Sequence, residues 1–363
     1  MPLGGFESIT FVCPIFVTGG TEAIHQANYA FNQYGVRSRI AYYGNGANHT
    51  RFGNNVVCSE PASNECLSVF ANYAPKAESA FSLEDNRLIV VPEIFAANYK
   101  QFAPASTAIW WLSVDNVIKK HPELLDKHIK DGIFADDKLI HFFQSEYAHR
   151  FLVEMDAEKV YRLGDYVSEI YRFDGINPGK RGSGIIFNKQ KGGALASRFF
   201  EGAKDIEHLA LTGFSSESLV ELYRNSSIYI DFGHFPGKDR MAREAAACGA
   251  IVFIHNDGAG KEFGDFPLSE FFRFSSADVE SGDLARRVRV VMAAPATYWI
   301  KQAPFRRSVF CEKSYFYQDV MQLLGRQGPL IEGKQRPVTD LISFRGHEEY
   351  LMSVARFNGK LPM

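Results

Sequence analysis

A polar turn between two apolar runs is the part of this chain best suited to chemistry. The runs Ile228–Phe232 and Ala250–Ile254 are typical of buried strands, and a turn and a helical segment lie between them. Ligands of open parallel sheets bind just beyond the carboxyl ends of the strands, and free N–H groups at a helix start suit phosphate. The pattern therefore predicts a diphosphate site at this turn. The turn carries Gly237, Lys238, Asp239 and Arg240, and the helix after it carries Glu244.

A glycine pair follows the first apolar run of the chain, Ile9–Val17. Gly19 and Gly20 allow the backbone to approach a ligand closely, and they leave N–H groups free at the start of the next helix. We expect Thr21 to cap this helix, which would cover Glu22–Tyr34. The third glycine of a dinucleotide-binding fingerprint is missing. The alternative interpretation is a tight strand-to-helix turn that binds nothing.

Two lysines follow another expected strand, Gly184–Phe187. Lys189 and Lys191 stand between the end of this strand and a helix expected over Gly193–Gly202. Cationic groups at a strand end can neutralise a diphosphate leaving group and so lower the cost of its departure. The alternative is a charged turn that is simply solvated.

Polar groups also follow expected strands in the first half of the chain. Asp115 or Glu93 could act as a general base for a hydroxyl group, because both stand where a ligand of a parallel sheet would lie. Helix capping is the competing interpretation, and we favour it for Ser145 and Asp115. Trp110 and Trp111 indicate packing in a core or at a domain interface rather than a stacking platform for a ligand.

Strands and helical segments alternate in two successive series. The first series has expected strands at Ile9–Val17, Arg37–Tyr43, Arg87–Val91, Ala108–Leu112 and Lys138–Gln144, with helices at Glu22–Tyr34, Glu93–Phe102, Asp115–Lys120 and Glu146–Met155. The second has expected strands at Gly184–Phe187, His208–Thr212, Ile228–Phe232, Ala250–Ile254 and Phe271–Phe274, with helices at Gly193–Gly202, Ser216–Arg224, Asp239–Ala247 and Ala277–Met292. This alternation predicts the α/β class, with two Rossmann-like β/α/β domains facing across a cleft.

A glycine- and proline-rich stretch separates the two series. We therefore expect an N-terminal domain over residues 1–165, a linker over 166–183, a C-terminal domain over 184–296 and a helical extension over 297–363. A chain of 363 residues is long enough for two domains with separate cores. Its net charge of −2 gives no electrostatic case for a nucleic-acid partner.

Cysteine and histidine spacing indicates neither a metal site nor a disulfide framework. Cys13 and Cys248 lie in apolar contexts and are expected to be reduced core thiols. Structural roles are also expected for His25, His49 and His141, which share no metal-ligand spacing. An odd cysteine count without a secretory signal favours a cytoplasmic location, and no apolar run is long enough to span a membrane.

The order strand, glycine turn, Glu-Ala-Ala-Ala-Cys-Gly, apolar strand resembles the donor-nucleotide segment of GT-B glycosyltransferases, especially the family-4-like enzymes of glycosyltransferase group 1. The resemblance implies that Glu244 holds the ribose of a nucleotide sugar. It also implies that Lys189 and Lys191 grip the donor diphosphate. The loop residues Gly19, Gly20 and Thr21 would line the cleft, with Glu22 either beside them or favoured by the helix dipole.

One position departs from this family pattern. Family-4-like enzymes carry a glutamate eight positions before the one that Glu244 matches, where it touches the donor sugar; this chain has Pro236 there. A proline cannot donate a hydrogen bond to a sugar hydroxyl, so other side chains must recognise the sugar, and the anomeric outcome stays open. Arg243 is interpreted as facing solvent, and Asp239 as either a site residue or a helix N-cap. The replacement candidates are His234, Lys238, Asp239 and Arg240.

The resemblance implies a hexosyl-type glycosyltransferase that acts in bacterial surface polysaccharide or glycoconjugate assembly. A nucleotide-sugar donor would react with a glycan or lipid-linked acceptor, without a metal or other cofactor. The extension over 297–363 would pack back on the first domain, and peripheral contact with the inner face of the membrane stays open. The alternatives are a catalytically degenerate GT-B module that binds nucleotide or glycan, and a sugar-nucleotide epimerase. The catalytic candidates are Glu22, Asp115, His234 and Asp239.

Overall fold

The computed structural model describes residues 3–43, 49–58, 65–126, 132–172 and 182–326. These residues divide into two compact units. Unit 1 contains the chain up to Tyr166, the short segment Pro236–Lys238 and the stretch that begins at Glu312. Unit 2 contains Val167–Phe235 and Asp239–Cys311. Residues 173–181 of the expected linker and 327–363 of the expected extension lie outside the described residues.

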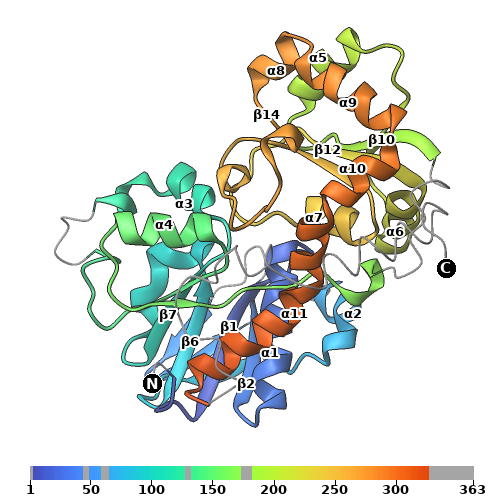
Figure 1. Ribbon diagram of the computed structural model, residues 1–363. Coiled ribbons are helices and arrows are strands. Elements are labelled where there is room, and N and C mark those ends of the chain that lie inside the picture. Colours follow the sequence, from blue (N-terminus) through green and yellow to red (C-terminus); the bar gives the residue numbers. More distant parts are fainter. Residues whose placement is uncertain (1–2, 44–48, 59–64, 127–131, 173–181, 327–363) are drawn as a thin grey trace. The chain divides into compact units, whose positions relative to one another are not determined.

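A six-stranded parallel sheet forms the centre of unit 1, with strand order β2-β1-β6-β7-β8-β9 (Figure 1). The order reverses between β1 and β6, so the carboxyl ends of these two strands are the topological switch point of the sheet. The strands are β1 (Ser8–Pro14), β2 (Arg37–Tyr43), β6 (Arg87–Pro92), β7 (Ser106–Trp111), β8 (Ile140–Phe143) and β9 (Val160–Arg162). The helices before Tyr166 are α1 (Gly19–Gln33), α2 (Glu65–Val69), α3 (Val114–Lys120) and α4 (Glu146–Glu154), with the 3₁₀ helices η1 (Ala71–Tyr73), η2 (Glu93–Phe102) and η3 (Pro122–Leu125).

Alternate residues of these strands enter two apolar cores, one on each face of the sheet. Phe11 and Trp110 point to the face covered by α1 and by the second half of α11 (Ala303–Leu323). Val12 and Trp111 point to the opposite face, where η2, α3 and α4 contribute side chains. Strands buried on both faces need nearly continuous apolar sequence, which is why the sequence predicts them clearly.

The end of the described chain completes the core of unit 1. Phe316 and Val320, both in α11, are buried in the same cluster as residues of β1 and α1. The carbonyl oxygen of Leu323 accepts the backbone N–H of Leu3 at 3.0 Å. Unit 1 therefore depends on residues that are distant from it in the sequence.

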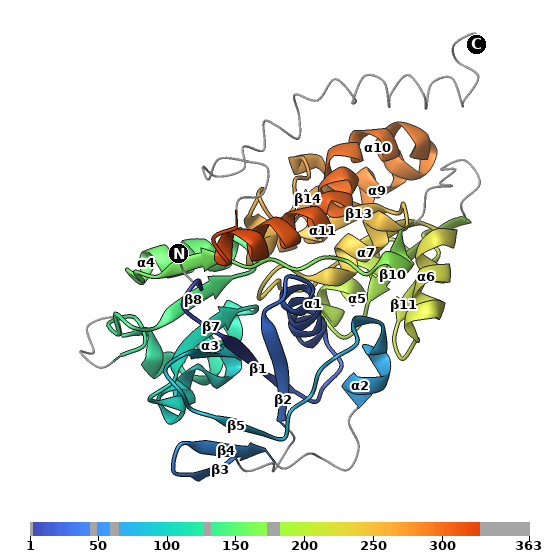
Figure 2. The same ribbon diagram turned by 90° about the horizontal axis from the view of Figure 1, so that it is seen from below.

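A small antiparallel sheet in unit 1 is absent from the sequence prediction (Figure 2). It consists of β3 (His49–Phe52), β4 (Asn55–Cys58) and β5 (Ala80–Ser82), which pair in the order β3-β4-β5. Val56 and Cys58 are buried, whereas Val57 between them is exposed. Strands of three or four residues are too short to produce a recognisable period, so the pattern gives no signal for them.

Unit 2 is built on a five-stranded parallel sheet with strand order β11-β10-β12-β13-β14. This order places the switch point between β10 and β12. The strands are β10 (Gly182–Asn188), β11 (His208–Leu211), β12 (Ser226–Asp231), β13 (Ile251–His255) and β14 (Arg273–Phe274). Figure 1 shows α5 (Gly193–Gly202), α8 (Ser276–Glu280) and α9 (Asp283–Ala293) on one side of the sheet, and α6 (Ser216–Asn225) and α7 (Arg240–Ala247) on the other. The last helix wholly in this unit is α10 (Pro295–Lys301).

The predicted α/β class and the two Rossmann-like sheets are confirmed, but several expected boundaries are wrong. The first strand ends at Pro14, and helix α1 begins with Thr18 as its N-cap instead of Thr21. The single helix expected near the end of unit 2 is divided into α8 and α9 at Gly282, whose φ is +76°. Helix η2 has the expected bounds but 3₁₀ geometry.

Candidate functional site

The loop after β10 lies at the switch point of the unit 2 sheet, where ligands of such sheets bind. It carries both predicted lysines; Lys189 is exposed and Lys191 is half-buried. Gly192 has a φ of +71°, and a Cβ atom there would lie 2.1 Å from the carbonyl oxygen of Phe232. Because glycine alone fits both this φ and this close approach, the loop is held firmly against the end of β12.

A charged cluster joins this loop to the start of α7. The Lys191 ammonium group forms an ion pair with the Asp239 carboxylate. Asp239 also accepts the Met241 N–H at 3.0 Å and is the N-cap of α7, the alternative that the sequence left open. The neighbouring carboxyl group of Asp231 is buried and accepts hydrogen bonds from the Tyr229 hydroxyl at 2.8 Å and from a backbone N–H.

The cluster moves the pKa values of its carboxyl groups in opposite directions. Burial, followed by the negative charge of Asp239, raises the pKa of Asp231 to about 6. Burial also acts to raise the pKa of Asp239, but the charge and hydrogen bond of Lys191 outweigh burial and lower it. Burial alone would lower the pKa of Lys191, yet Asp239 raises it. Near neutral pH, the switch point of the unit 2 sheet therefore holds the positively charged Lys191, paired with the carboxylate of Asp239.

Helix α7 carries two residues of the predicted donor segment and buries both. Arg240 and Glu244 are buried, and Arg243 is 0% exposed. The Nε–H group of Arg243 donates to the carbonyl oxygen of Asp239 at 3.0 Å. The expectation that Arg243 faces solvent is therefore wrong. The reason is that the alanines of α7 are buried too, which leaves this part of the helix without a solvent face.

A histidine and a carboxylate meet where the loops after β12 and β13 run together. A backbone bridge pairs Phe235 with Gly258, and the Phe235 carbonyl oxygen accepts the Ala259 N–H at 2.8 Å. Next to this bridge, His234 Nδ1 lies 2.8 Å from Asp257 Oδ2. Burial acts to raise the pKa of Asp257, but the hydrogen bond and charge of His234 outweigh it and lower the pKa.

The glycine pair lies at the switch point of the unit 1 sheet, at the start of α1. Here the Thr18 hydroxyl accepts the Thr21 N–H at 3.3 Å, and the Thr21 hydroxyl accepts the Thr18 N–H at 2.9 Å. Thr21 is buried and serves this reciprocal cap, so its hydroxyl supports the turn that presents Gly19 and Gly20. Glu22 accepts a hydrogen bond from the Tyr73 hydroxyl at 2.6 Å.

A buried carboxyl group follows β6 at the same switch point. Glu93 is 3% exposed, and its Oε2 accepts the backbone N–H of Leu112 at 3.1 Å. Burial raises the pKa of Glu93 to about 7. A carboxyl group that titrates near neutrality can both take up and release protons at working pH, which is what a general base must do.

The capping predictions at the neighbouring strands have different outcomes. Ser145 caps α4, because its hydroxyl accepts the Ala148 N–H at 3.1 Å, and this prediction is confirmed. Asp115 lies inside the first turn of α3, whose N-cap position is occupied by Ser113, so its assignment as a cap is wrong. Asp115 instead accepts the Tyr147 hydroxyl at 2.8 Å.

The middle of the predicted donor turn belongs to unit 1. A Cβ atom on Gly237 would lie 2.1 Å from the Leu112 carbonyl oxygen, so the backbones are in close contact there. Lys238 Nζ lies 2.9 Å from Glu312 Oε1, and both side chains are largely buried. The predicted donor residues Gly237 and Lys238 are thus described with unit 1, and Arg240 and Glu244 with unit 2.

Several other expectations from the sequence can be compared with the described residues. Within these residues, no group of three or more metal-ligating side chains gathers, and no helix has the length and apolar character to cross a bilayer. Cys13 and Cys248 are buried thiols, as expected. His25 bonds to the Tyr42 hydroxyl, and His141 accepts the indole N–H of Trp111, so both are structural.

Sequence reasoning did not single out Asp231 as a site residue, nor Asp257 as the partner of His234. Asp231 is the last residue of β12, and a carboxylate at that place in an apolar strand was a usable signal. The pairing of Asp257 with His234 carries no sequence signal, because it depends on two loops meeting in space.

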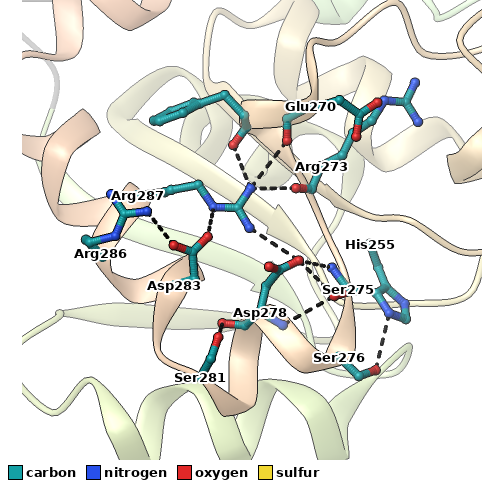
Figure 3. A network of polar contacts seen from close by, with 11 residues as sticks. His255, Glu270, Arg273, Ser275, Ser276, Asp278, Ser281, Asp283, Arg286 and Arg287 are labelled. Atoms are coloured by element: carbon teal, nitrogen blue, oxygen red, sulfur yellow. Dashed lines mark hydrogen bonds and ion pairs between the residues drawn. The ribbon is translucent and has the colours of Figure 1, made fainter.

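An open pocket of about 450 Å³ lies in unit 2 at the ends of β13 and β14. Figure 3 shows the network of polar contacts that includes several of its lining residues. Arg287, largely buried, donates to the carbonyl oxygens of Arg273 at 2.6 Å and Phe271 at 2.9 Å. Arg287 Nε also lies 2.8 Å from Asp283 Oδ2, and Asp278 is a second acidic neighbour. Because these charged groups pair with one another, the pocket is a structural feature and we do not assign the site to it.

No protein-family model and no curated protein matches this sequence. Solved structures do match it. Sucrose-phosphate synthase from Thermosynechococcus elongatus aligns with a TM-score of 0.58 at 13% identity, over 87% of this chain and 98% of that chain. Anabaena HepE, in complex with UDP and glucose, aligns with a TM-score of 0.58 at 10% identity over 88% and 100%. S. aureus TarM, in a complex that includes UDP, aligns with a TM-score of 0.60 at 7% identity over 88% and 100%.

The chain has the GT-B fold. The resemblance stated from the donor turn and the glycine pair is thereby confirmed at the level of the fold. Each unit of this GT-B protein contributes one switch point, with Gly19 and Glu93 at that of unit 1 and Lys191 at that of unit 2. Fold alone does not fix an activity, which must be argued from these groups.

Proposed function

We propose that this GT-B protein transfers a sugar from a nucleotide-activated donor to an acceptor hydroxyl. The observation that carries the proposal is the Lys191–Asp239 pair beside a glycine-packed loop at the unit 2 switch point. A diphosphate bound there would compete with Asp239 for Lys191, and the cation would then neutralise the charge that develops as the sugar bond breaks. Two structures of similar fold, HepE and TarM, contain UDP.

The donor is proposed to bind chiefly to unit 2. Lys191 and the exposed Lys189 would grip the diphosphate, and Glu244 would bind the ribose. In unit 1, the N–H groups of Gly19 and Gly20 at the start of α1 also suit a phosphate group, because a helix start carries a partial positive charge. The complete set of proposed donor residues is Gly19, Gly20, Thr21, Lys189, Lys191, Gly237, Lys238, Arg240 and Glu244.

The acceptor is proposed to bind to unit 1, at the carboxyl ends of its strands. Glu93 or Asp115 would take the proton from the acceptor hydroxyl, and the raised pKa of Glu93 suits that role. Glu22 is the third acidic candidate, and its bond from Tyr73 fixes its position. A glycan or a lipid-linked glycan, in polysaccharide or glycoconjugate assembly, is the proposed acceptor, and the transferred sugar is proposed to be a hexose.

We further propose that transfer needs no metal ion and takes place in the cytoplasm, with peripheral membrane contact where the acceptor carries a lipid. Lys191 and helix N-termini would hold the leaving diphosphate in place of a metal ion. Equal initial rates in EDTA and in Mg²⁺ would support transfer without a metal ion. A rate that falls to background in EDTA and returns with Mg²⁺ would contradict it.

The test is a thermal-shift panel of nucleoside diphosphates and sugar nucleotides, followed by turnover assays with the donor selected. A ligand that binds the native state raises its melting temperature by mass action. Nucleoside diphosphate release that requires an acceptor is the expected result. Binding without release under any acceptor would favour a degenerate binding module, and isomerisation of the donor without acceptor would favour an epimerase. No shift with any nucleotide would overturn the proposal.

A further inference from the structure

Two carboxyl groups share one lysine at the switch point of the unit 2 sheet. Lys191 pairs with the Asp239 carboxylate, and its charge also acts on the carboxyl group of Asp231. Gly233 lies between the two side chains, because a Cβ atom on it would lie 2.7 Å from Lys191 Cβ and 3.0 Å from Asp231 Oδ1. A single ammonium group therefore compensates two negative charges.

The Asp231 carboxyl group is fixed within this cluster. It is 1% exposed, and both of its oxygen atoms accept hydrogen bonds: Oδ2 from the Tyr229 hydroxyl at 2.8 Å and Oδ1 from the Gly233 N–H at 2.9 Å. Burial, followed by the charge of Asp239, raises the pKa of Asp231, whereas the charge of Lys191 lowers it. The protonation of Asp231 therefore depends on where the Lys191 ammonium group lies.

The other titratable groups that the described structure places around this cluster do not take over the role of Lys191. Arg243 lowers the pKa of Asp239, so that carboxylate keeps a second cation, and His234 pairs with Asp257. Burial keeps three further side chains neutral near neutral pH, since it lowers the pKa of an imidazole and raises the pKa values of two phenols. These side chains are His255 of β13, Tyr223 of α6 and Tyr229 of β12.

We propose that binding of the donor diphosphate at Lys191 is coupled to the uptake of a proton by Asp231; the proposal rests on the donor site of the transferase function above. When the ammonium group turns from Asp239 to the diphosphate, Asp231 loses the cation that favours its carboxylate, while Asp239 keeps Arg243. The negative charge of the diphosphate acts in the same direction. Solvent supplies the proton, and Asp231 returns it to solvent when the nucleoside diphosphate leaves.

The coupling makes donor affinity depend on pH. The pKa of Asp231 is about 6, so near neutral pH its carboxyl group is mostly ionised before the donor binds and partly protonated afterwards. Donor affinity should therefore fall as pH rises through neutrality. If binding raises this pKa by about 1, we expect about 0.4 proton taken up per donor at about pH 7, and binding about 5-fold weaker at pH 8 than at pH 6.

Titration calorimetry in two buffers of different ionisation enthalpy measures the proton uptake together with the affinity. The probe is UDP-glucose, ADP-glucose or GDP-mannose, whichever raises the melting temperature most. The phosphates of these sugar nucleotides do not titrate near neutrality, whereas the terminal phosphate of a nucleoside diphosphate has a pKa of about 6. Asp231→Asn retains an oxygen for the Gly233 N–H. It should take up less than about 0.1 proton, with affinities at pH 6 and pH 8 that agree within about 2-fold.

Two lysine variants separate Lys191 from the rest of its loop. Lys191→Met has no ammonium group to move from Asp239, so the uptake that accompanies binding should fall to less than about half of the wild-type value. Lys189→Met is the matched control, because it removes an exposed cation of the same loop and retains the Lys191–Asp239 pair, and its uptake should equal that of the wild type.

A wild-type protein that binds the probe with less than about 0.1 proton taken up would overturn the inference and leave the donor site intact. Uptake that persists unchanged in a folded Asp231→Asn would also overturn it. Should that variant fail to fold, unchanged uptake in Lys191→Met has the same consequence. No binding of any sugar nucleotide would overturn the transferase proposal, and this inference with it.

Discussion

Glu93 accepts the backbone N–H of Leu112 at 3.1 Å, and the carbonyl oxygen of Leu112 is in close contact with Gly237. The buried carboxyl group of Glu93 thus holds the N–H of Leu112, while the carbonyl group of Leu112 packs against the donor turn at Gly237. The two contacts together fix the Leu112 backbone at the carboxyl end of β7.

The raised pKa of Glu93, about 7, makes the stability of unit 1 depend on pH. The folded state holds a proton that the unfolded state releases near its ordinary value of 4.5, so stability should fall as pH rises from 4.5 to about 7. The upper limit is about 3 kcal/mol. Glu93→Gln should remove this slope, as measured by urea unfolding at several pH values with tryptophan fluorescence, to which Trp110 and Trp111 of unit 1 and Trp299 of unit 2 contribute. The exposed Glu123→Gln is the control, and an unchanged slope in Glu93→Gln would contradict the assignment.

Gly237→Ala should destabilise the protein, because the new methyl group would lie 2.1 Å from the Leu112 carbonyl oxygen. Backbone atoms on both sides must then move, and we expect a loss of at least about 2 kcal/mol. Gly5→Ala is a matched control in the same unit, since nothing lies within 4 Å of its Cβ position. Equal melting temperatures for the two variants would show that Gly237 is not closely packed.

Lys191→Met should weaken nucleoside diphosphate binding about 10-fold or more, and Lys189→Met much less, because Lys191 alone is fixed by an ion pair. Titration calorimetry with the nucleotide that shifts the melting temperature gives both values. Lys191→Met also removes the ion-pair partner of Asp239, which then lies beside Asp231 without the lysine charge. The double variant with Asp239→Asn removes that complication, and recovery of wild-type affinity there would contradict a direct role for Lys191.

Arg287→Met should destabilise unit 2 by about 3–5 kcal/mol, because it leaves the carbonyl oxygens of Arg273 and Phe271 without this donor and removes one of the two cations beside Asp283 (Figure 3). Arg286→Met is the matched control. Arg286 pairs with the same Asp283, but its side chain is 69% exposed, so we expect a change below about 1 kcal/mol. Thermal unfolding of the two variants checks the difference, and similar losses in both would contradict the structural role.

The doubly wound sheets were predictable because strands buried on both faces have an unmistakable apolar sequence. Trp110 and Trp111 show the limit of that signal. The apolar run predicts that both side chains are buried, but it does not predict that the two rings enter opposite cores. The helix caps were less predictable. Thr18 and Thr21 are equally good caps by type, and the choice between them depends on where the strand before them ends.

The candidate site was predictable only where one loop supplies all of its parts. The lysines after β10 and the turn before α1 lie at the two switch points, as alternating strands require. The partners of these residues were not predictable. Asp257 with His234 and Glu312 with Lys238 are pairs between segments far apart in the chain, and sequence patterns report local spacing alone.

The second half of α11 has a consequence for how the chain folds as it leaves the ribosome. The core of unit 1 includes Phe316, Val320 and Leu323, which are synthesised after all of Val167–Cys311. Domains usually fold in the order of their synthesis, the N-terminal one first. Here the first unit begins earlier but cannot close its core until the second has been made. Its apolar surface beside β1 and α1 therefore stays exposed during synthesis, where it can bind a chaperone.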